Sequence, residues 1–152
     1  MSYRLPRVLP PVVFLILLLL LVPLELYHST DFGVLRGDRQ LPWDVMLLIG
    51  LILLLGARAQ FSKNNSEINT FETPRNLITS GLFRLSRNPM YMGFLFVLLA
   101  AAFYVNTACA LLAPLAFFIA ANWWYIPHEE FAARKTFGSD YEKYTQRVRR
   151  WL

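Results

Sequence analysis

Charged and polar side chains gather at the two ends of one long apolar stretch, where they have the chemistry to bind a small polar ligand. Arg84 and Arg87 precede the stretch, and Glu129 and Glu130 follow it. The asparagine and proline directly after Arg87 are typical of a helix start, where free backbone amides and the helix dipole favour an anion. The two carboxylates can accept hydrogen bonds from an ammonium group or from hydroxyls. A ligand that carries a carboxylate, an amine and hydroxyls would match both groups of residues, whereas an anionic lipid headgroup would match only the basic group. Taken alone, the residues also suit ordinary charged helix ends at a membrane interface.

The composition is that of a membrane protein. Of the 152 residues, 56% are hydrophobic and only 16% are charged, against roughly 25% charged residues in an average soluble domain. The basic residues lie beside apolar stretches, which favours a role next to membrane lipids over nucleic-acid binding. The single cysteine, Cys109, excludes an intrachain disulfide and a cysteine cluster for metal. We expect no metal site, and we expect Cys109 to be a small buried apolar side chain.

The apolar stretches predict an all-α integral membrane protein with about four transmembrane helices, folded as a single membrane domain over residues 1–152. The expected spans are residues 8–27, 43–58, 90–105 and 107–126. The polar pair Asn106-Thr107 lies at the junction of the last two spans, which predicts a tight C-terminal helical hairpin. Pro127 is expected to begin a new helix after the fourth span.

The distribution of lysine and arginine predicts the orientation in the membrane. With four spans, the N-terminus, the segment 59–89 and the tail 127–152 share one side, and 13 of the 15 Lys and Arg residues lie in or next to these parts. Only Arg36 and Arg39 lie on the other side. Because cytoplasmic segments carry the excess of basic residues, both termini and the proposed site are expected in the cytoplasm.

The segment 59–89 and the tail 127–152 are expected to lie on the cytoplasmic surface of the membrane. The segment has spaced apolar residues that would hold it there: Ile68, Phe71, Leu77, Ile78, Leu82 and Phe83. In the tail, Gly138 suits the end of one helix, and Ser139 with Glu142 has the pattern of a capping box that opens another. This last helix would be amphipathic, with one apolar stripe: Tyr141, Tyr144, Val148 and Trp151.

Three further polar residues have structural roles in this reading. Asn88 or Ser86 is expected to cap the helix of the third span. Asn122 lies inside the fourth span, where a hydrogen bond between helices is the first expectation and a ligand contact is the alternative.

The ordered polar residues resemble the motifs of the isoprenylcysteine carboxyl methyltransferase and phospholipid methyltransferase families. The first part of the resemblance is Gly81-Leu82-Phe83-Arg84, followed by Arg87-Asn88-Pro89-Met90-Tyr91 and Gly93. The second part is the pair Glu129-Glu130 and a tail of the form Phe-Gly-x-x-Tyr-x-x-Tyr that ends in arginines: Phe137, Gly138, Tyr141, Tyr144, Arg147, Arg149 and Arg150. The pieces occur in the families' order and cover about half of the chain.

The resemblance implies a membrane-embedded methyltransferase that uses S-adenosylmethionine. It implies cofactor contacts from seven residues: Arg87, Asn88, Tyr91, Gly93, Glu129, Glu130 and Tyr141. It assigns catalytic roles, in closing over the cofactor or positioning the acceptor, to Arg147, Arg150 and Asn88. The families most often have histidine at position 88, and asparagine cannot exchange a proton, so a general base at this place is in question. His128 is an alternative.

The reaction implied by the resemblance is direct displacement onto a lipophilic or lipid-modified acceptor that enters from the bilayer. A prenylated cysteine carboxylate, an amine headgroup, a thiol and another small lipophile all remain open as acceptors. Two other functions also remain open. One is a sterol-reductase-like enzyme that uses a nicotinamide dinucleotide phosphate, since the C-terminal part of those enzymes has a similar motif. The other is a non-catalytic membrane protein whose basic face binds anionic lipid or a partner.

Overall fold

A computed structural model of the protein describes residues 8–27, 40–64 and 74–152. These residues form helices and no strands. The long elements are α1 (Pro10–Tyr27), α2 (Gln40–Lys63), α3 (Pro89–Val105), α4 (Leu112–Ala120), α5 (Ile126–Phe137) and α6 (Ser139–Arg147). Three short helical turns complete them: η1 (Gly81–Arg84), η2 (Ala108–Leu111) and the π-helical η3 (Ala121–Tyr125).

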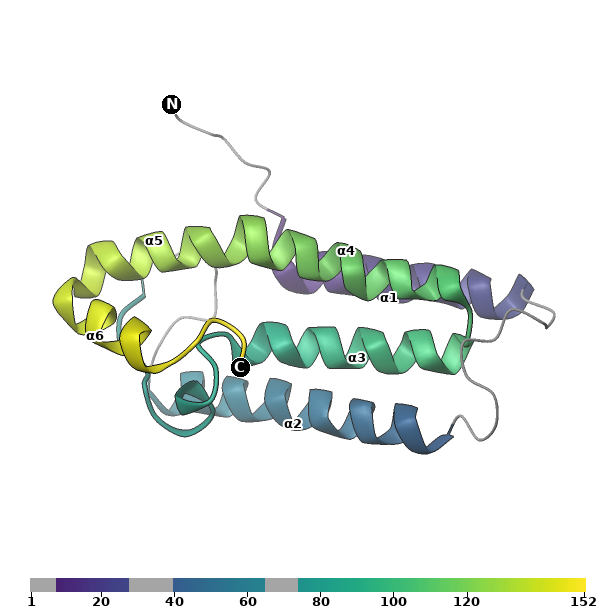
Figure 1. The fold of residues 1–152 in the computed structure, drawn as a ribbon, viewed down its shortest axis with the longest axis horizontal. Coiled ribbons are helices and arrows are strands. Elements are labelled where there is room, and N and C mark those ends of the chain that lie inside the picture. Colours follow the sequence, from purple (N-terminus) through teal and green to yellow (C-terminus); the bar gives the residue numbers. More distant parts are fainter. Residues whose placement is uncertain (1–7, 28–39, 65–73) are drawn as a thin grey trace, which may run out of the picture.

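The four apolar helices α1 to α4 lie side by side, and α3 contacts each of the other three (Figure 1). Aromatic side chains fill the centre of this bundle. The ring centroids of Phe14 and Phe94 are 4.7 Å apart, and those of Phe94 and Phe117 are 5.7 Å apart. Contacts of this kind add to the free energy gained from burying the rings. These ring contacts hold α1, α3 and α4 together.

The contact between α2 and α3 depends on glycine. A Cβ atom on Gly93 would lie 2.7 Å from Leu54 Cγ and 3.0 Å from the carbonyl oxygen of Gly50. Small residues at such a crossing let two helix backbones approach closely, as is common between helices in membranes. The structure therefore uses Gly93 for helix packing, on the side of α3 that faces α2.

Two helical stretches, Pro42–Lys63 and Ala108–Phe137, are long and apolar enough to cross a membrane. Pro10–Leu26 and Pro89–Val105 are apolar but shorter. The outer faces of the helices also expose many large apolar side chains, among them Leu15, Leu19, Leu48, Ile52, Leu55 and Leu115. A contiguous apolar exterior of this kind suits contact with lipid and is unusual on a soluble monomer.

Two predicted helix ends differ from the structure. The helix α2 continues past Arg58 to Lys63. The predicted end of the fourth helix at Ile126 is only a change of winding, because the helical run continues from Ala108 to Phe137. The π-helical turn η3 lies just before Pro127, and it accommodates the proline that would otherwise disturb a regular α-helix.

The tail also departs from its predicted local structure. Gly138, with φ of 49°, is the residue before α6, so Ser139 lies inside the helix and the predicted capping box is wrong. Tyr141, Tyr144 and Val148 do share one apolar cluster, but this cluster packs on the protein, against Ile78, Phe83 and neighbouring side chains. Trp151 lies beyond the end of α6.

Two further predictions, one for Cys109 and one for two residues of the surface segment, are not confirmed. Cys109 is exposed on η2, so the expectation that it is buried is wrong. Ile68 and Phe71, expected to anchor the surface segment, lie outside the described residues.

Candidate active site

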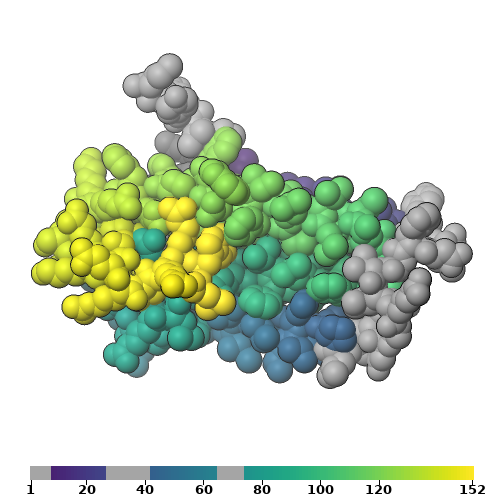
Figure 2. All heavy atoms as spheres, viewed as in Figure 1, coloured from purple at the N-terminus to yellow at the C-terminus, as the bar shows by residue number. Residues whose placement is uncertain are grey.

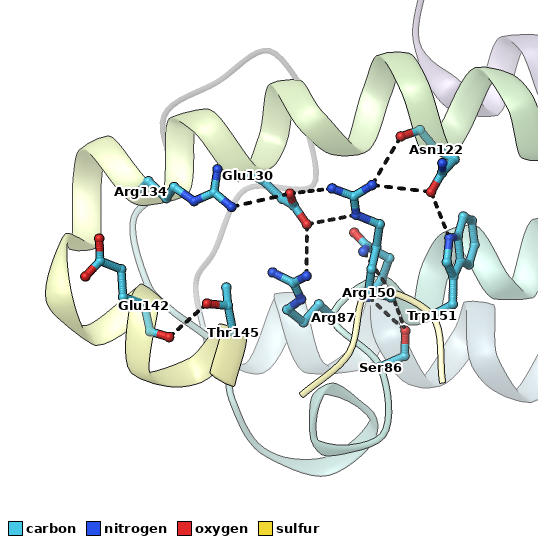
Figure 3. Close-up of polar contacts among 10 residues, drawn as sticks. Ser86, Arg87, Asn122, Glu130, Arg134, Glu142, Thr145, Arg150 and Trp151 are labelled. Carbon is cyan, nitrogen blue, oxygen red and sulfur yellow. Dashed lines mark hydrogen bonds and ion pairs between the residues drawn. The ribbon is translucent and has the colours of Figure 1, made fainter. Parts of the chain in front are cut away.

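The carboxylate of Glu130 is the centre of a buried polar cluster at one end of the bundle (Figure 3). Glu130 is only 5% exposed. Arg150 binds it with two hydrogen bonds, from Nε to Oε1 at 3.1 Å and from Nη2 to Oε2 at 2.7 Å. Arg87 Nη2 lies 3.2 Å from the same Oε1, and Arg134 lies 3.8 Å from Oε2. A carboxylate can be buried here because cations and hydrogen bonds replace its water.

Asn122 holds the same arginine from the opposite direction. Arg150 Nη1 donates to the side-chain oxygen of Asn122 at 3.3 Å and to its backbone oxygen at 3.4 Å. The side-chain oxygen also accepts a hydrogen bond from Trp151 Nε1 at 3.1 Å. The guanidinium of Arg150 is therefore fixed between α5 and η3. Its hydrogen bonds with Glu130 raise the pKa of Arg150 above its usual value.

The backbone oxygen of Asn122 is available because of the winding of η3. The N–H of Ile126 donates to Ala121, five residues back, as in a π-helix. The next donor in this pattern would be the N–H of residue 127, which is a proline and has none. Arg150 supplies the hydrogen bond that the helix does not.

The last residues of the chain form a strap across the start of α3. The N–H of Arg87 donates to the backbone oxygen of Arg149 at 3.0 Å. Ser86 Oγ and Asn88 Nδ2 both donate to the backbone oxygen of Arg150, at 3.1 Å and 3.0 Å. Figure 2 shows this tail, in yellow, on the surface between α5 and the segment around η1. The motif before α3 thus fixes the backbone from which the Arg150 side chain projects.

Asn88 does occupy the position before α3, but its side chain does not cap the helix. Its amide is used for Arg150 instead. The hydroxyl of Ser86 accepts from the N–H of Asn88 at 3.0 Å, which shapes the turn before the helix. The prediction of a side-chain cap at this helix is therefore wrong for both residues.

A small cavity of about 70 Å³ lies beside the Glu130 cluster. Arg87, Asn88, Tyr91 and Glu129 line it together with apolar residues from four segments: Pro10, Pro11, Phe61, Phe83, Pro89, Met90 and Phe94. Tyr91 donates its hydroxyl to Glu129 Oε1 at 2.7 Å. The Nε and Nη1 atoms of Arg87 are buried and have no hydrogen-bond partner among the described residues. A buried guanidinium with free donors favours an anionic group beside it.

Tyr141 and Tyr144, on α6 in the tail, lie next to the Glu130 cluster. Burial raises the pKa of Tyr141, and the negative charge of Glu130 raises it further, whereas Arg87 and Arg134 act in the opposite direction. Burial also raises the pKa of Tyr144, whose hydroxyl donates to the backbone oxygen of Phe83 at 2.6 Å. The hydrogen bond of Tyr144 joins α6 to η1.

The structure brings most of the predicted site residues to one place, and their contacts differ. Arg87, Glu130, Arg150 and Tyr141 belong to the buried cluster, and Asn88, Tyr91 and Glu129 line the adjoining cavity with Arg87. Gly93 faces α2 instead. Arg147 lines a different hollow, and His128 is exposed on α5.

Sequence reasoning missed Ser86 and Trp151 as parts of the site, and it did not connect Asn122 with Arg150. One signal was present. A polar residue within an apolar helix, with a proline five residues later, marks a carbonyl that can lose its helical partner. The contacts of Ser86 and Trp151 depend on how the tail folds back, and local sequence does not determine this.

Comparison with known proteins identifies the family of this chain. The family model for phospholipid methyltransferases matches residues 44–140. Two rice proteins, from Oryza sativa subsp. indica and subsp. japonica, are described as probable protein-S-isoprenylcysteine O-methyltransferases. Each is 34% identical to this chain over 112 residues, which is 68% of this chain and 56% of the rice protein. The chain therefore spans about half the length of these relatives.

A shorter relative covers part of the same region. An uncharacterized protein from Haemophilus influenzae is 36% identical over 63 residues, which is 41% of this chain and 100% of that protein. No solved structure gives a significant match. The matching model covers more than half of the chain, including the start of α3, Asn122 and the Glu129-Glu130 pair, and the chain therefore belongs to the phospholipid methyltransferase family.

Proposed function

We propose that this chain transfers a methyl group from S-adenosylmethionine to a lipophilic acceptor in the membrane. The observation that carries this proposal is the meeting of two distant motifs in one place. Arg87, Asn88 and Tyr91 from the start of α3 line the same cavity as Glu129 from α5. Family membership gives the reaction class, and the cavity gives a place for it.

The residues present fit the chemistry of the cofactor. The free donors of Arg87 suit a carboxylate, and the Glu129 carboxylate, already oriented by Tyr91, suits an ammonium group or ribose hydroxyls. The rings of Phe61, Phe83 and Phe94 suit a purine and a sulfonium cation. The cavity of about 70 Å³ is below the roughly 300–1,000 Å³ of typical small-molecule sites, so binding of the whole cofactor requires it to widen.

When bound, S-adenosylmethionine supplies a methyl group on a positively charged sulfur, which is already an activated donor. The protein then has to orient the two reactants and exclude water. Arg87 and Glu129 would hold the polar groups of the cofactor, and the aromatic lining would keep water out. Glu130 and Asn122 would act indirectly. Glu130 fixes the side chains of Arg87 and Arg150, and Asn122 fixes that of Arg150. Asn88 cannot accept a proton in this scheme and instead holds the tail.

The acceptor that we propose first is a prenylated cysteine with a free carboxylate. The names of the rice relatives designate such a substrate for those proteins. A carboxylate needs no general base, because it is already ionised at neutral pH. This suits a site whose position 88 is asparagine.

The proposal includes a membrane arrangement. We place α1, α2, α3 and the run from η2 to η3 across the membrane, with α3 and α4 as a hairpin. The Glu130 cluster, the tail and both termini would then face the cytoplasm, in agreement with the excess of lysine and arginine at that end. The apolar outer faces of the helices support this arrangement.

The direct test is methyl transfer by the purified protein in detergent. S-adenosylmethionine with a tritiated methyl group is offered with an S-prenylated cysteine and, separately, with phosphatidylethanolamine. We expect label in the prenylated cysteine, and loss of this activity in Arg87→Gln. Label in the amine lipid alone would replace the proposed acceptor. No label in either acceptor, from protein shown to be folded, would contradict the proposed reaction.

A further inference from the structure

Two arginines of the motifs lie outside the Glu130 cluster and face a separate hollow. Arg84, from η1, and Arg147, the last residue of α6, line a hollow of about 700 Å³ together with Lys143 and Thr79. These residues come from segments far apart in the sequence that meet at the same end of the bundle (Figure 1). Their convergence is not explained by the reaction, because neither arginine touches Glu130 or the cavity beside it.

The hollow is positively charged and its cations are available. Within the part of the chain that the structure describes, neither Arg84 nor Arg147 forms an ion pair. Lys143 lies 3.5 Å from Asp140, but both side chains are well exposed, at 66% and 76%. A pair this exposed is weak and leaves most of the attraction of the lysine for other anions. Three cations against one carboxylate give the hollow a net positive charge.

The frame of the hollow is fixed by buried contacts. The hydrogen bond from Tyr144 to the backbone oxygen of Phe83 joins α6 to η1. Tyr144 and Val148 pack with Ile78 and Phe83 in one apolar cluster below it. Arg84 and Arg147 are therefore presented by two elements that are tied together. The site needs no large rearrangement to form.

We propose that this hollow binds the phosphate-bearing headgroup of an anionic membrane lipid. Arginine and lysine suit phosphate oxygens, and Thr79 adds a hydroxyl donor. Leu77, Phe137 and Val148 line the same hollow, and such an apolar lining suits the glycerol and upper chains of a lipid better than a freely hydrated anion. The hollow also lies at the end of the apolar bundle, at the depth of lipid headgroups in the proposed membrane arrangement. This proposal does not depend on the reaction.

The experiment measures binding of short-chain phosphatidylglycerol to the detergent-purified protein by calorimetry. Short-chain phosphatidylcholine tests the need for net negative charge, and inorganic phosphate tests for a soluble-anion site. Arg84→Gln and Lys143→Gln remove charge from the hollow. The matched controls are Arg58→Gln on α2 and Lys135→Gln on α5, which remove the same charges from exposed positions outside it. Circular dichroism and thermal unfolding check that each variant is folded.

We expect saturable binding of phosphatidylglycerol that is weakened about fivefold by each hollow variant and unchanged in the controls. Phosphatidylcholine should bind much more weakly. Equal weakening in hollow variants and controls would show diffuse attraction by the net charge and would overturn the proposal. Saturation by inorganic phosphate with the same dependence on Arg84 would assign the hollow to a soluble anion. No saturable binding to folded protein would also overturn it.

Discussion

Arg150 and Asn122 are linked by two hydrogen bonds, one to the side-chain oxygen of Asn122 and one to its backbone oxygen, at 3.3 Å and 3.4 Å. The π-helical winding before Pro127 makes the second bond possible, because it leaves this carbonyl without a helical donor. The arginine is therefore oriented by an irregularity in a membrane helix. Irregular turns of this kind often accompany functional sites.

The first prediction concerns Asn122. Both contacts of its side chain use the oxygen as an acceptor, from Arg150 and from Trp151. Asn122→Ala should therefore release the strap and weaken S-adenosylmethionine binding about tenfold, because hydrogen bonds to charged groups contribute about 1.5–3 kcal/mol. Asn122→Asp keeps the acceptors and should retain binding. Hydrogen exchange of the Arg87 amide, which bonds to the tail, should rise in the alanine variant alone.

This comparison separates positioning from general stability. If aspartate behaves like alanine in the exchange measurement, the acceptor role of Asn122 is wrong. The exchange result does not depend on whether the protein is a methyltransferase.

The second prediction separates the two glutamates. Glu130→Gln removes the buried charge that neutralises Arg87 and Arg150, and should lower the free energy of unfolding by about 3–5 kcal/mol. Glu129→Gln still offers an oxygen to the Tyr91 hydroxyl, so its effect should be smaller than that of Glu130→Gln. Thermal or denaturant unfolding in detergent gives both values. Equal effects in the two variants would contradict the assignment of Glu130 as the centre of the cluster.

The third prediction concerns Gly93, for which the family resemblance implies a cofactor contact and the structure shows a helix crossing. Gly93→Ala places a methyl group against the backbone of α2 and should destabilise the protein by about 1–3 kcal/mol. Gly56→Ala is the matched control. Its added Cβ would meet only the flexible end of Leu82, at 2.7 Å, which can turn away. A cofactor-binding defect in Gly93→Ala without any loss of stability would favour the contact that the resemblance implies.

The fourth prediction is a pH dependence at Tyr144. Burial raises the pKa of this phenol in the folded protein above the value of 10.0 that an exposed tyrosine has. The folded state then holds the proton more tightly than the unfolded chain. The contribution of Tyr144 to stability is therefore complete below pH 10 and decreases as the pH rises above it.

Tyr144→Phe isolates this effect, because it removes the titrating group and the hydrogen bond to Phe83 together. At pH 8 the wild type should be more stable than the variant by about 1 kcal/mol. The difference should shrink between pH 10 and 11. A difference that stays constant over this range would show that Tyr144 does not titrate differently in the two states.

Sequence patterns predicted the main helices and named several residues that the structure brings together, for physical reasons that particular residues illustrate. Long apolar runs identify membrane-type helices because a helix satisfies its backbone hydrogen bonds within its own segment in lipid. The Arg87-Asn88-Pro89 motif marks the start of α3 because proline suits a first turn. The Glu129-Glu130 pair was found because two carboxylates follow an apolar run at once.

Other features could not be predicted from the sequence, because they depend on how the helices and the tail pack together. The contacts of Gly93 depend on where α2 crosses α3, and those of Trp151 depend on how the tail returns over Asn122. The two glutamates are adjacent in sequence but point to different partners, because neighbouring residues on a helix are separated by about 100°. Arg147 and Arg150 also have different surroundings, because α6 ends at Arg147 and Arg150 lies beyond the helix.

The measurement that tests the central claim most directly is calorimetric binding of S-adenosylmethionine to the detergent-purified protein, with a nicotinamide dinucleotide phosphate as the comparison ligand. The account predicts saturable binding of S-adenosylmethionine alone, weakened at least tenfold by Arg87→Gln and by Glu129→Ala, the two charged residues that line the cavity. Absence of binding by folded wild-type protein, or an affinity in both variants equal to that of the wild type, would contradict it. Binding of the nicotinamide cofactor instead would indicate a reductase.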